Sequence, residues 1–170
     1  MNYNIKQSEI SFDNFKYVEV IKGNAQGFIG DKFQTAFFKF IVKDIEFIDD
    51  YEGYKPQKNN QLIDAIITFE NTNIYDESQM MFRNDFQIQW HNIEYDFMHG
   101  KNFSYGLDIE NSDAIFPVEF EQDKNKKNTF HIVYEVPIEA DTFSISYLEK
   151  FDDGTQYGRA GNAFWVYFKK

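Results

Sequence analysis

The stretch from Phe130 to Glu149 contains two runs in which apolar and polar residues alternate with a period of two. The apolar parity holds Phe130, Ile132, Tyr134 and Val136 in the first run, and Phe143, Ile145 and Tyr147 in the second. Successive side chains of a strand point to opposite faces, so this alternation predicts two strands with one buried face each. Pro137 cannot donate a ladder hydrogen bond, and we expect it to end the first strand at a corner. Two such strands need a second sheet to cover them.

The same alternation recurs along the chain, with turn-forming residues between the runs. It predicts further strands over residues 35–47, 62–71, 86–90, 115–120 and 163–168. Many short strands with turn signals and no amphipathic helix indicate an all-β fold, an antiparallel two-sheet sandwich. A chain of 170 residues is long enough for one domain. We expect residues 1–29 to form an N-terminal extension and residues 30–170 to form the sandwich.

The parity of the runs also predicts which side chains are buried. The expected core residues are Phe38, Phe40, Ile67, Phe69, Ile132, Tyr134, Ile145 and Val166. Trp90 and Trp165 also stand at strand positions, and we expect both to pack in the core. The high aromatic content, 19% of the chain, favours such half-buried pleated surfaces.

Composition excludes several classes of function. The chain has no cysteine, so it can form neither disulfides nor thiolate metal sites and has no cysteine nucleophile. A net charge of -11 disfavours nucleic acid and anionic membrane surfaces as partners. No segment approaches the length of a membrane span, and the first ten residues lack the apolar core of a signal peptide. A protein partner is compatible with this composition, and the oligomeric state stays open.

No residue pattern predicts a catalytic, cofactor or metal site. Acidic residues cluster at Asp49, Asp50 and Glu52, at Asp108, Glu110 and Asp113, and at Asp152 and Asp153. None of these clusters has the spacing of a calcium loop, so we interpret them as solvated loops and expect no dependence on metal. The histidines, His91, His99 and His131, have no close-spaced partner that would indicate zinc. Neither a Gly-x-Ser-x-Gly elbow nor a phosphate-binding loop is present.

The long connection from His91 to Ala114 offers the one candidate for a partner-binding surface. Gly100 and Gly106 bracket Phe103 and Tyr105, an arrangement typical of an exposed loop tip. We therefore predict that Phe103 and Tyr105 belong to a partner-binding surface. The alternative is that these two aromatic residues fold back as a lid over the sandwich.

Several blocks of the sequence together carry a resemblance to a known family. The blocks are Gly30-Asp-x-Phe-x-Thr-Ala-Phe-Phe-x-Phe-x-Val42, Tyr51-Glu-Gly-Tyr54, Asn60-Gln-Leu62, Asp85-Phe-Gln-Ile-Gln-Trp90, Tyr134-Glu-Val-Pro137 and Phe143-Ser-Ile-Ser-Tyr147. Their order resembles bacterial immunoglobulin-like domains of unknown function found in cell-envelope lipoproteins of Gram-positive bacteria. That family is similar in fold to the mycobacterial secreted immunoprotective antigen.

The resemblance implies an immunoglobulin-like sandwich, export and no known catalysis, and it assigns no functional residues. Its members usually begin with a lipoprotein signal and a lipidated cysteine, and this sequence shows neither. We expect a non-catalytic, extracytoplasmic or cell-surface domain for protein interaction or adhesion, with a cytoplasmic location as the alternative. A second hypothesis is a soluble acidic inhibitor or immunity-type protein that binds a basic partner. A third is a hydrolase with a carboxylate pair, since spatial separation decides whether two acids cooperate.

Overall fold

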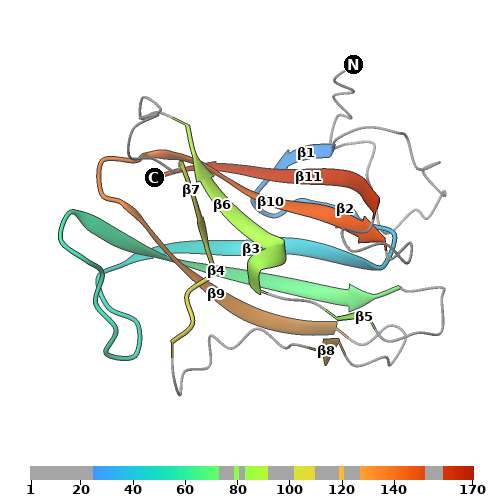
Figure 1. Ribbon diagram of the computed structural model, residues 1–170, viewed down its shortest axis with the longest axis horizontal. Helices are drawn as coiled ribbons and strands as arrows, with labels where there is room; N and C mark the ends of the chain where they lie inside the picture. Colours follow the sequence, from blue (N-terminus) through green and yellow to red (C-terminus); the bar gives the residue numbers. More distant parts are fainter. Residues whose placement is uncertain are drawn as a thin grey trace.

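A computed structural model describes residues 25–72, 79–80, 83–91, 102–109, 119–120, 127–151 and 159–170. Two sheets lie face to face, as predicted (Figure 1). The five-stranded sheet has the order β1 (Ala25–Phe28), β11 (Arg159–Lys169), β10 (Thr142–Phe151), β6 (Phe86–Trp90) and β7 (Phe103–Tyr105). The four-stranded sheet has the order β2 (Lys32–Gln34), β3 (Phe38–Ile48), β4 (Asn60–Asn71) and β9 (Lys127–Pro137).

The remaining elements are short. β5 (Gln79–Met80) pairs with β8 (Glu119–Phe120), and a 3₁₀ helix, η2 (Arg83–Asp85), leads into β6. Within the described ranges the chain contains no α-helix, and hence no helix with the length and apolar run that a membrane crossing requires. The all-β two-sheet architecture expected from the sequence is therefore confirmed.

The strand pairing is antiparallel except at one edge, where β1 runs parallel to β11. Ala25 lies beside Phe164 and Phe28 beside Tyr167 in this ladder. The sequence assigned these four residues to the N-terminal extension, whereas here they form the edge strand of the five-stranded sheet. Residues 1–24, the rest of that expected extension, lie outside the described residues.

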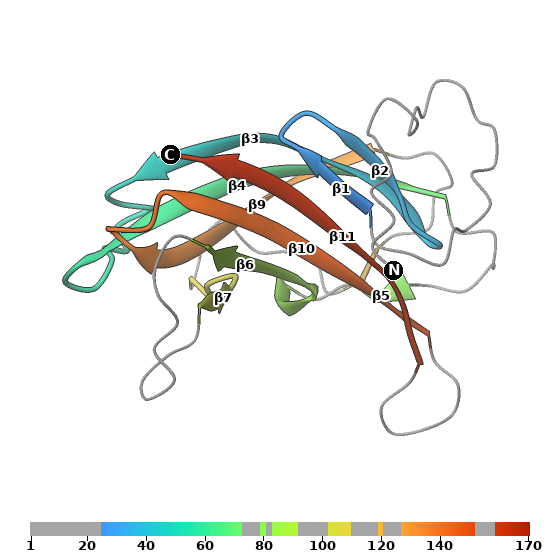
Figure 2. The same ribbon diagram turned by 90° about the horizontal axis from the view of Figure 1, so that it is seen from above.

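The corner predicted at Pro137 carries the chain from one sheet to the other. β9 ends at Pro137, and the amide of Ala140 donates to the Pro137 carbonyl at 3.1 Å. β9 pairs with β4, whereas β10 pairs with β6 and β11. The two strands on either side of the corner therefore belong to opposite sheets and bury their apolar faces against the same core (Figure 2).

The core between the sheets is mostly aromatic. All eight side chains predicted to be buried are at most 2% exposed, which confirms the parity argument. Phe40 stacks on Phe33 at 5.0 Å between ring centroids and meets Phe86 edge to face at 5.6 Å. Phe86 in turn contacts Phe38 and Phe69, so rings from both sheets interlock. Many of the chain's phenylalanines are thus core residues rather than ligand contacts.

Two polar groups also join the sheets within this core. The hydroxyl of Tyr134, on β9, donates to the carbonyl of Phe86, on β6, at 3.0 Å. Burial raises the pKa of Tyr134, which keeps the hydroxyl protonated and able to donate. A buried phenol needs such an acceptor because an unpaired hydroxyl in an apolar core is unfavourable.

The second polar link is the carboxylate of Glu149, which is only 2% exposed. Its Oε1 accepts from the amide of Ala36 at 2.7 Å, and its Oε2 accepts from the amide of Asn162 at 2.8 Å. Ala36 belongs to the turn between β2 and β3, and Asn162 belongs to β11, so one side chain connects the two sheets. Gly161 leaves the necessary space, because a Cβ there would lie 2.6 Å from Glu149 Oε2.

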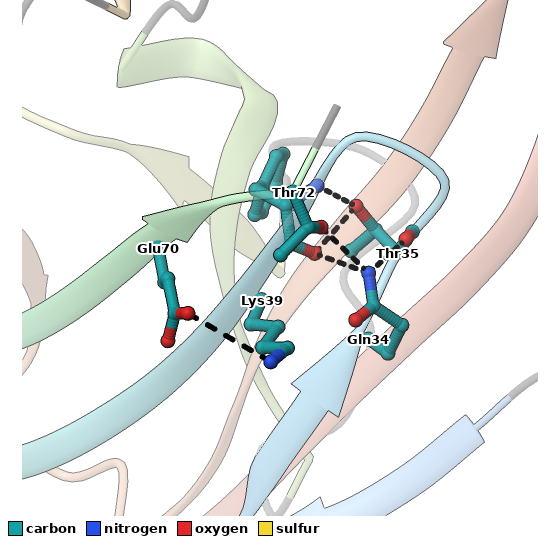
Figure 3. Close-up of polar contacts among 6 residues, drawn as sticks. Gln34, Thr35, Lys39, Glu70 and Thr72 are labelled. Atoms are coloured by element: carbon teal, nitrogen blue, oxygen red, sulfur yellow. Dashed lines mark hydrogen bonds and ion pairs between the residues drawn. The ribbon is translucent and has the colours of Figure 1, made fainter. Parts of the chain in front are cut away.

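The turn that Glu149 holds is itself closed by side chains (Figure 3). Thr35 Oγ1 accepts from the amides of Phe37 and Phe38, both at 3.1 Å. Gln34 Nε2 donates to Thr72 Oγ1 at 2.9 Å, which fastens the turn to the end of β4. The side chains of Thr35 and Gln34 therefore hold the β2–β3 turn in place at this end of the sandwich.

Candidate binding surface

The outer face of the five-stranded sheet carries two rows of side chains that run across all five strands. Strand register defines both rows, because directly paired residues point to the same face. From β1 to β7 the first row holds Phe28, Tyr167, Ser144, Gln89 and Phe103, and the second holds Gln26, Trp165, Ser146, Gln87 and Tyr105. We call these ten residues the aromatic-amide face.

The aromatic-amide face contains no Asp, Glu, Lys or Arg, although such residues make up 26% of the chain. Its aromatic rings lie on β1, β11 and β7, and the amides and hydroxyls of Gln87, Gln89, Ser144 and Ser146 lie on β6 and β10 between them. The outer face of the four-stranded sheet is the opposite in character. It carries Lys32, Lys39, Asp44, Glu46, Asp64, Glu70, Lys127, His131 and Glu135.

Several rings of the aromatic-amide face reach solvent. Phe28 is 65% exposed and Tyr105 is 40% exposed, whereas Trp165, Tyr167 and Phe103 are half-buried. The rings of Phe103 and Tyr105 meet edge to face at 5.6 Å. Phe28 and Tyr105 lie on the two edge strands, and the half-buried rings of Trp165 and Tyr167 lie between them. Five rings that reach solvent on one face mark a candidate surface for recognition.

Two predictions about aromatic residues differ from what the structure shows. Phe103 and Tyr105 lie not on a loop tip but on β7, an edge strand paired with β6. The expectation that Trp165 packs in the core is wrong, since Phe164 and Val166 point inward and Trp165 points outward. Trp90, at 8% exposure, does belong to the core. Tyr95, another aromatic residue of the connection from His91 to Ala114, lies outside the described residues.

A histidine and a serine meet beside the first row. His91 Nε2 lies 2.9 Å from Ser144 Oγ, and its ring lies 5.9 Å from that of Tyr167. Partial desolvation at these contacts lowers the pKa of His91, so the ring is neutral at pH 7. Ser144 is fully buried, in the middle of a strand paired on both sides, which leaves no room for an acyl substrate or an oxyanion hole. We interpret the pair as a structural contact.

Several ionisable groups on the outer face of the four-stranded sheet pair with one another. His131 Nδ1 lies 2.9 Å from Asp64 Oδ2, and Lys39 Nζ lies 3.8 Å from Glu70 Oε1. In the adjoining loop between β3 and β4, Asp50 Oδ1 accepts from the amide of Gly53 at 3.1 Å. Over the described ranges no group of three or more His, Asp or Glu side chains could hold a metal ion. Glu110, Asp113, Asp152 and Asp153 lie outside those ranges. The absence of metal dependence therefore stays a prediction.

Glu135 organises the loop between β3 and β4. Its carboxylate accepts from the hydroxyl of Tyr54 at 2.7 Å, the amide of Gln57 at 2.7 Å and Asn60 Nδ2 at 2.8 Å. Partial burial by itself would raise the pKa of Glu135, but these three donors outweigh it and hold the pKa below its ordinary value. The hydrogen bond from the Tyr54 hydroxyl to Glu135, together with partial burial, raises the pKa of Tyr54.

We expect Glu135→Gln to remove part of the acid sensitivity of the fold. A carboxyl whose pKa is lower in the folded chain stabilises the fold above its unfolded pKa, near 4.3. That contribution disappears as the pH falls through the folded value. Melting temperatures recorded between neutral and acidic pH should therefore converge for wild type and Glu135→Gln at low pH and differ at pH 7. A difference that is constant over the whole range would contradict this role.

Comparison with known proteins supports the fold and no more. No protein-family model matches the chain, and no curated protein matches it. One similar solved structure is a Bacillus subtilis protein, ycdA, described as a candidate lipoprotein. The TM-score is 0.57 at 11% identity, and the match covers 81% of this chain but only 38% of that one. Another is an uncharacterised β-sandwich protein from Clostridium difficile, with a TM-score of 0.48, 14% identity, and coverage of 87% and 96% of the two chains.

Proposed function

We propose that this chain is a non-catalytic, immunoglobulin-like recognition domain that works in adhesion at the cell envelope and binds through its aromatic-amide face. The observation that carries the proposal is the contrast between the two outer faces. The outer face of the four-stranded sheet carries nine ionisable side chains, several of them in local contacts. The ten positions of the aromatic-amide face carry none, and they hold five aromatic rings, two of them exposed. A face that served only to keep the domain soluble would carry charges like the rest of the surface.

The strand order supports the immunoglobulin-like assignment. β3, β4 and β9 are neighbours in one sheet, whereas β11, β10, β6 and β7 follow one another in the other sheet. Immunoglobulin sandwiches place strands A, B and E in one sheet and G, F, C and C′ in the other, with the same alternation along the chain. The likeness to the candidate lipoprotein from Bacillus subtilis favours an envelope location.

The test places a charge at the centre of the aromatic-amide face. Ser146 lies on β10, near the middle of its row, and Ser146→Glu would bury a carboxylate without a partner beneath any bound ligand. We expect this variant to bind the envelope fraction of the source organism at least about tenfold more weakly than wild type, a loss of about 1.4 kcal/mol. Sedimentation of the labelled domain with the envelope fraction measures the affinity.

The matched control is Thr129→Glu, on the outer face of the four-stranded sheet. Thr129 is exposed on a strand, and its replacement adds the same charge. Binding should be unchanged in this variant and insensitive to added salt. If the affinity falls steeply with added salt and is the same for wild type and Ser146→Glu, the proposal is contradicted. That result would favour an acidic inhibitor of a basic partner.

A further inference from the structure

The chemistry of the aromatic-amide face narrows what it can bind. Carboxylates, ammonium and guanidinium groups are absent from its ten positions, and Lys169 lies beyond the first row, two residues from Tyr167 on β11. An ionic ligand centred on the two rows would find no opposite charge within them. His91, beside the first row, is neutral at pH 7 as well. The two rows therefore favour an uncharged ligand, because they offer a charged ligand no opposite charge.

The polar groups on the face match hydroxyl groups. Gln87, Gln89 and Gln26 each carry an amide that donates and accepts, and Ser146 carries a hydroxyl that does both. A ligand hydroxyl is itself both donor and acceptor, so every such side chain can pair with it. Aliphatic side chains, which a purely apolar partner would prefer, are absent from the two rows.

The rings supply the second half of a carbohydrate site. A pyranose ring presents C–H groups on its faces and hydroxyl groups around its edge. It can therefore stack on an aromatic ring while its hydroxyls bond to neighbouring amides. Trp165 stands directly beside Ser146, and Phe103 and Tyr105 stand directly beside Gln89 and Gln87.

The size of the face argues against a protein partner. Five strands about 4.8 Å apart make each row about 19 Å long, and two residues of a strand span about 6.8 Å. Two rows, each about 19 Å long and about 6.8 Å wide, cover about 260 Å² in projection, about a third of the roughly 800 Å² that each partner of a standard protein interface buries. A second copy of this chain faces the same shortage of area. A glycan chain a few sugar units long fits the available surface.

We propose that the aromatic-amide face binds an uncharged glycan of the cell envelope. This inference rests on the proposed function and adds the class of ligand. Trp165 and Tyr167 form the stacking platform at one side of the face, and Gln87 and Gln89 supply hydrogen bonds to the sugar hydroxyls.

The first test uses the envelope fraction in three forms: untreated, digested with protease, and oxidised with periodate, which cleaves the vicinal diols of sugars. We expect the domain to bind the untreated and the protease-digested envelopes and not to bind the oxidised envelopes. Binding that survives periodate and disappears with protease would overturn the glycan proposal in favour of a protein partner, while the adhesion function would stand. Absence of binding to untreated envelopes would overturn both.

The second test asks for the chemical class directly. In affinity electrophoresis, gels containing hydroxyethylcellulose, laminarin or galactomannan probe uncharged glycans, and polygalacturonate probes an anionic one. We expect retardation by at least one of the first three and none by polygalacturonate. Retardation by polygalacturonate alone, or by no polysaccharide in the panel, would overturn the proposal.

Two variants assign the retardation to the face. Trp165→Ala removes a stacking ring, and Gln87→Leu keeps the size of the side chain while removing its hydrogen bonds. We expect each to weaken binding at least about tenfold, as for other central aromatic and polar contacts. Ile138→Ala, at a residue 53% exposed in the corner between β9 and β10, should bind like wild type. Unchanged binding in Gln87→Leu, with the variant shown to be folded by its melting curve, would contradict recognition of hydroxyl groups.

Discussion

Phe86→Ala is expected to lower the free energy of unfolding by about 3–5 kcal/mol, the range for truncation of a fully buried phenylalanine. Phe86 is fully buried on the five-stranded sheet, and its ring contacts Phe38, Phe40 and Phe69 from the opposite sheet. Its ring also stacks on Tyr147 at 5.0 Å. Alanine would leave a cavity that the surrounding rings cannot fill, because rigid aromatic side chains collapse poorly into a gap.

Thermal melting provides the measurement. At about 2–4 °C for each kcal/mol in a chain of this size, Phe86→Ala should melt roughly 6–20 °C below wild type. Phe86→Leu keeps most of the volume and should lose less, and Ile138→Ala on the surface should change little. A loss of only a degree or two in Phe86→Ala would mean that the two sheets are not held together by this cluster of rings.

Glu149→Ala is expected to destabilise the fold by about 2–4 kcal/mol, about 1–2 kcal/mol for each amide left without an acceptor. The amides of Ala36 and Asn162 both donate to this carboxylate in partly buried surroundings. Surface acids usually contribute little to stability, so an effect of this size from a single acidic residue would identify it as an internal link between the sheets.

Two further variants separate this link from simple loss of packing. Glu149→Gln keeps the shape and one acceptor oxygen, but points an amide donor at one of the two backbone amides, so it should recover only part of the loss. Gly161→Ala leaves Glu149 in the sequence but places a Cβ 2.5 Å from the Phe151 ring and 2.6 Å from Glu149 Oε2. It should therefore destabilise the fold as well. Wild-type stability in Glu149→Gln would show that the charge and its two acceptors are dispensable.

The sequence predicts the sandwich well because its strongest signal is alternation. Ile67, Ile132 and Val166 alternate with polar or outward residues, and all three are fully buried. Alternation depends only on which side of a strand faces water, so it needs no knowledge of the partner strand. The same rule places Glu149 on the buried side of its strand, together with Phe143, Ile145 and Tyr147. A glutamate is ordinarily expected at the surface, so the type of residue gives no sign of this burial.

The binding surface could not be predicted in the same way. On the last strand both parities are aromatic, with Phe164 and Val166 on one side and Trp165 and Tyr167 on the other. Period-two reasoning places Val166 correctly, but with an aromatic run on the other side as well it also leads to the wrong expectation that Trp165 is buried. The rows also depend on register between strands far apart in sequence, such as β7 on β6 and β1 on β11. Only the pairing brings Phe28 and Tyr105 onto one face.

The parallel ladder between β1 and β11 has a mechanical consequence for the adhesion that we propose. The chain enters at the Ala25 end of β1 and leaves β11 at Lys169, and the two strands run in the same direction. Tension between these points pulls the strands along each other in opposite senses. The evenly spaced hydrogen bonds of a parallel pair then carry the load together in shear, rather than opening one after another like a zip. We therefore expect this four-residue edge strand to resist such tension before the rest of the sandwich opens.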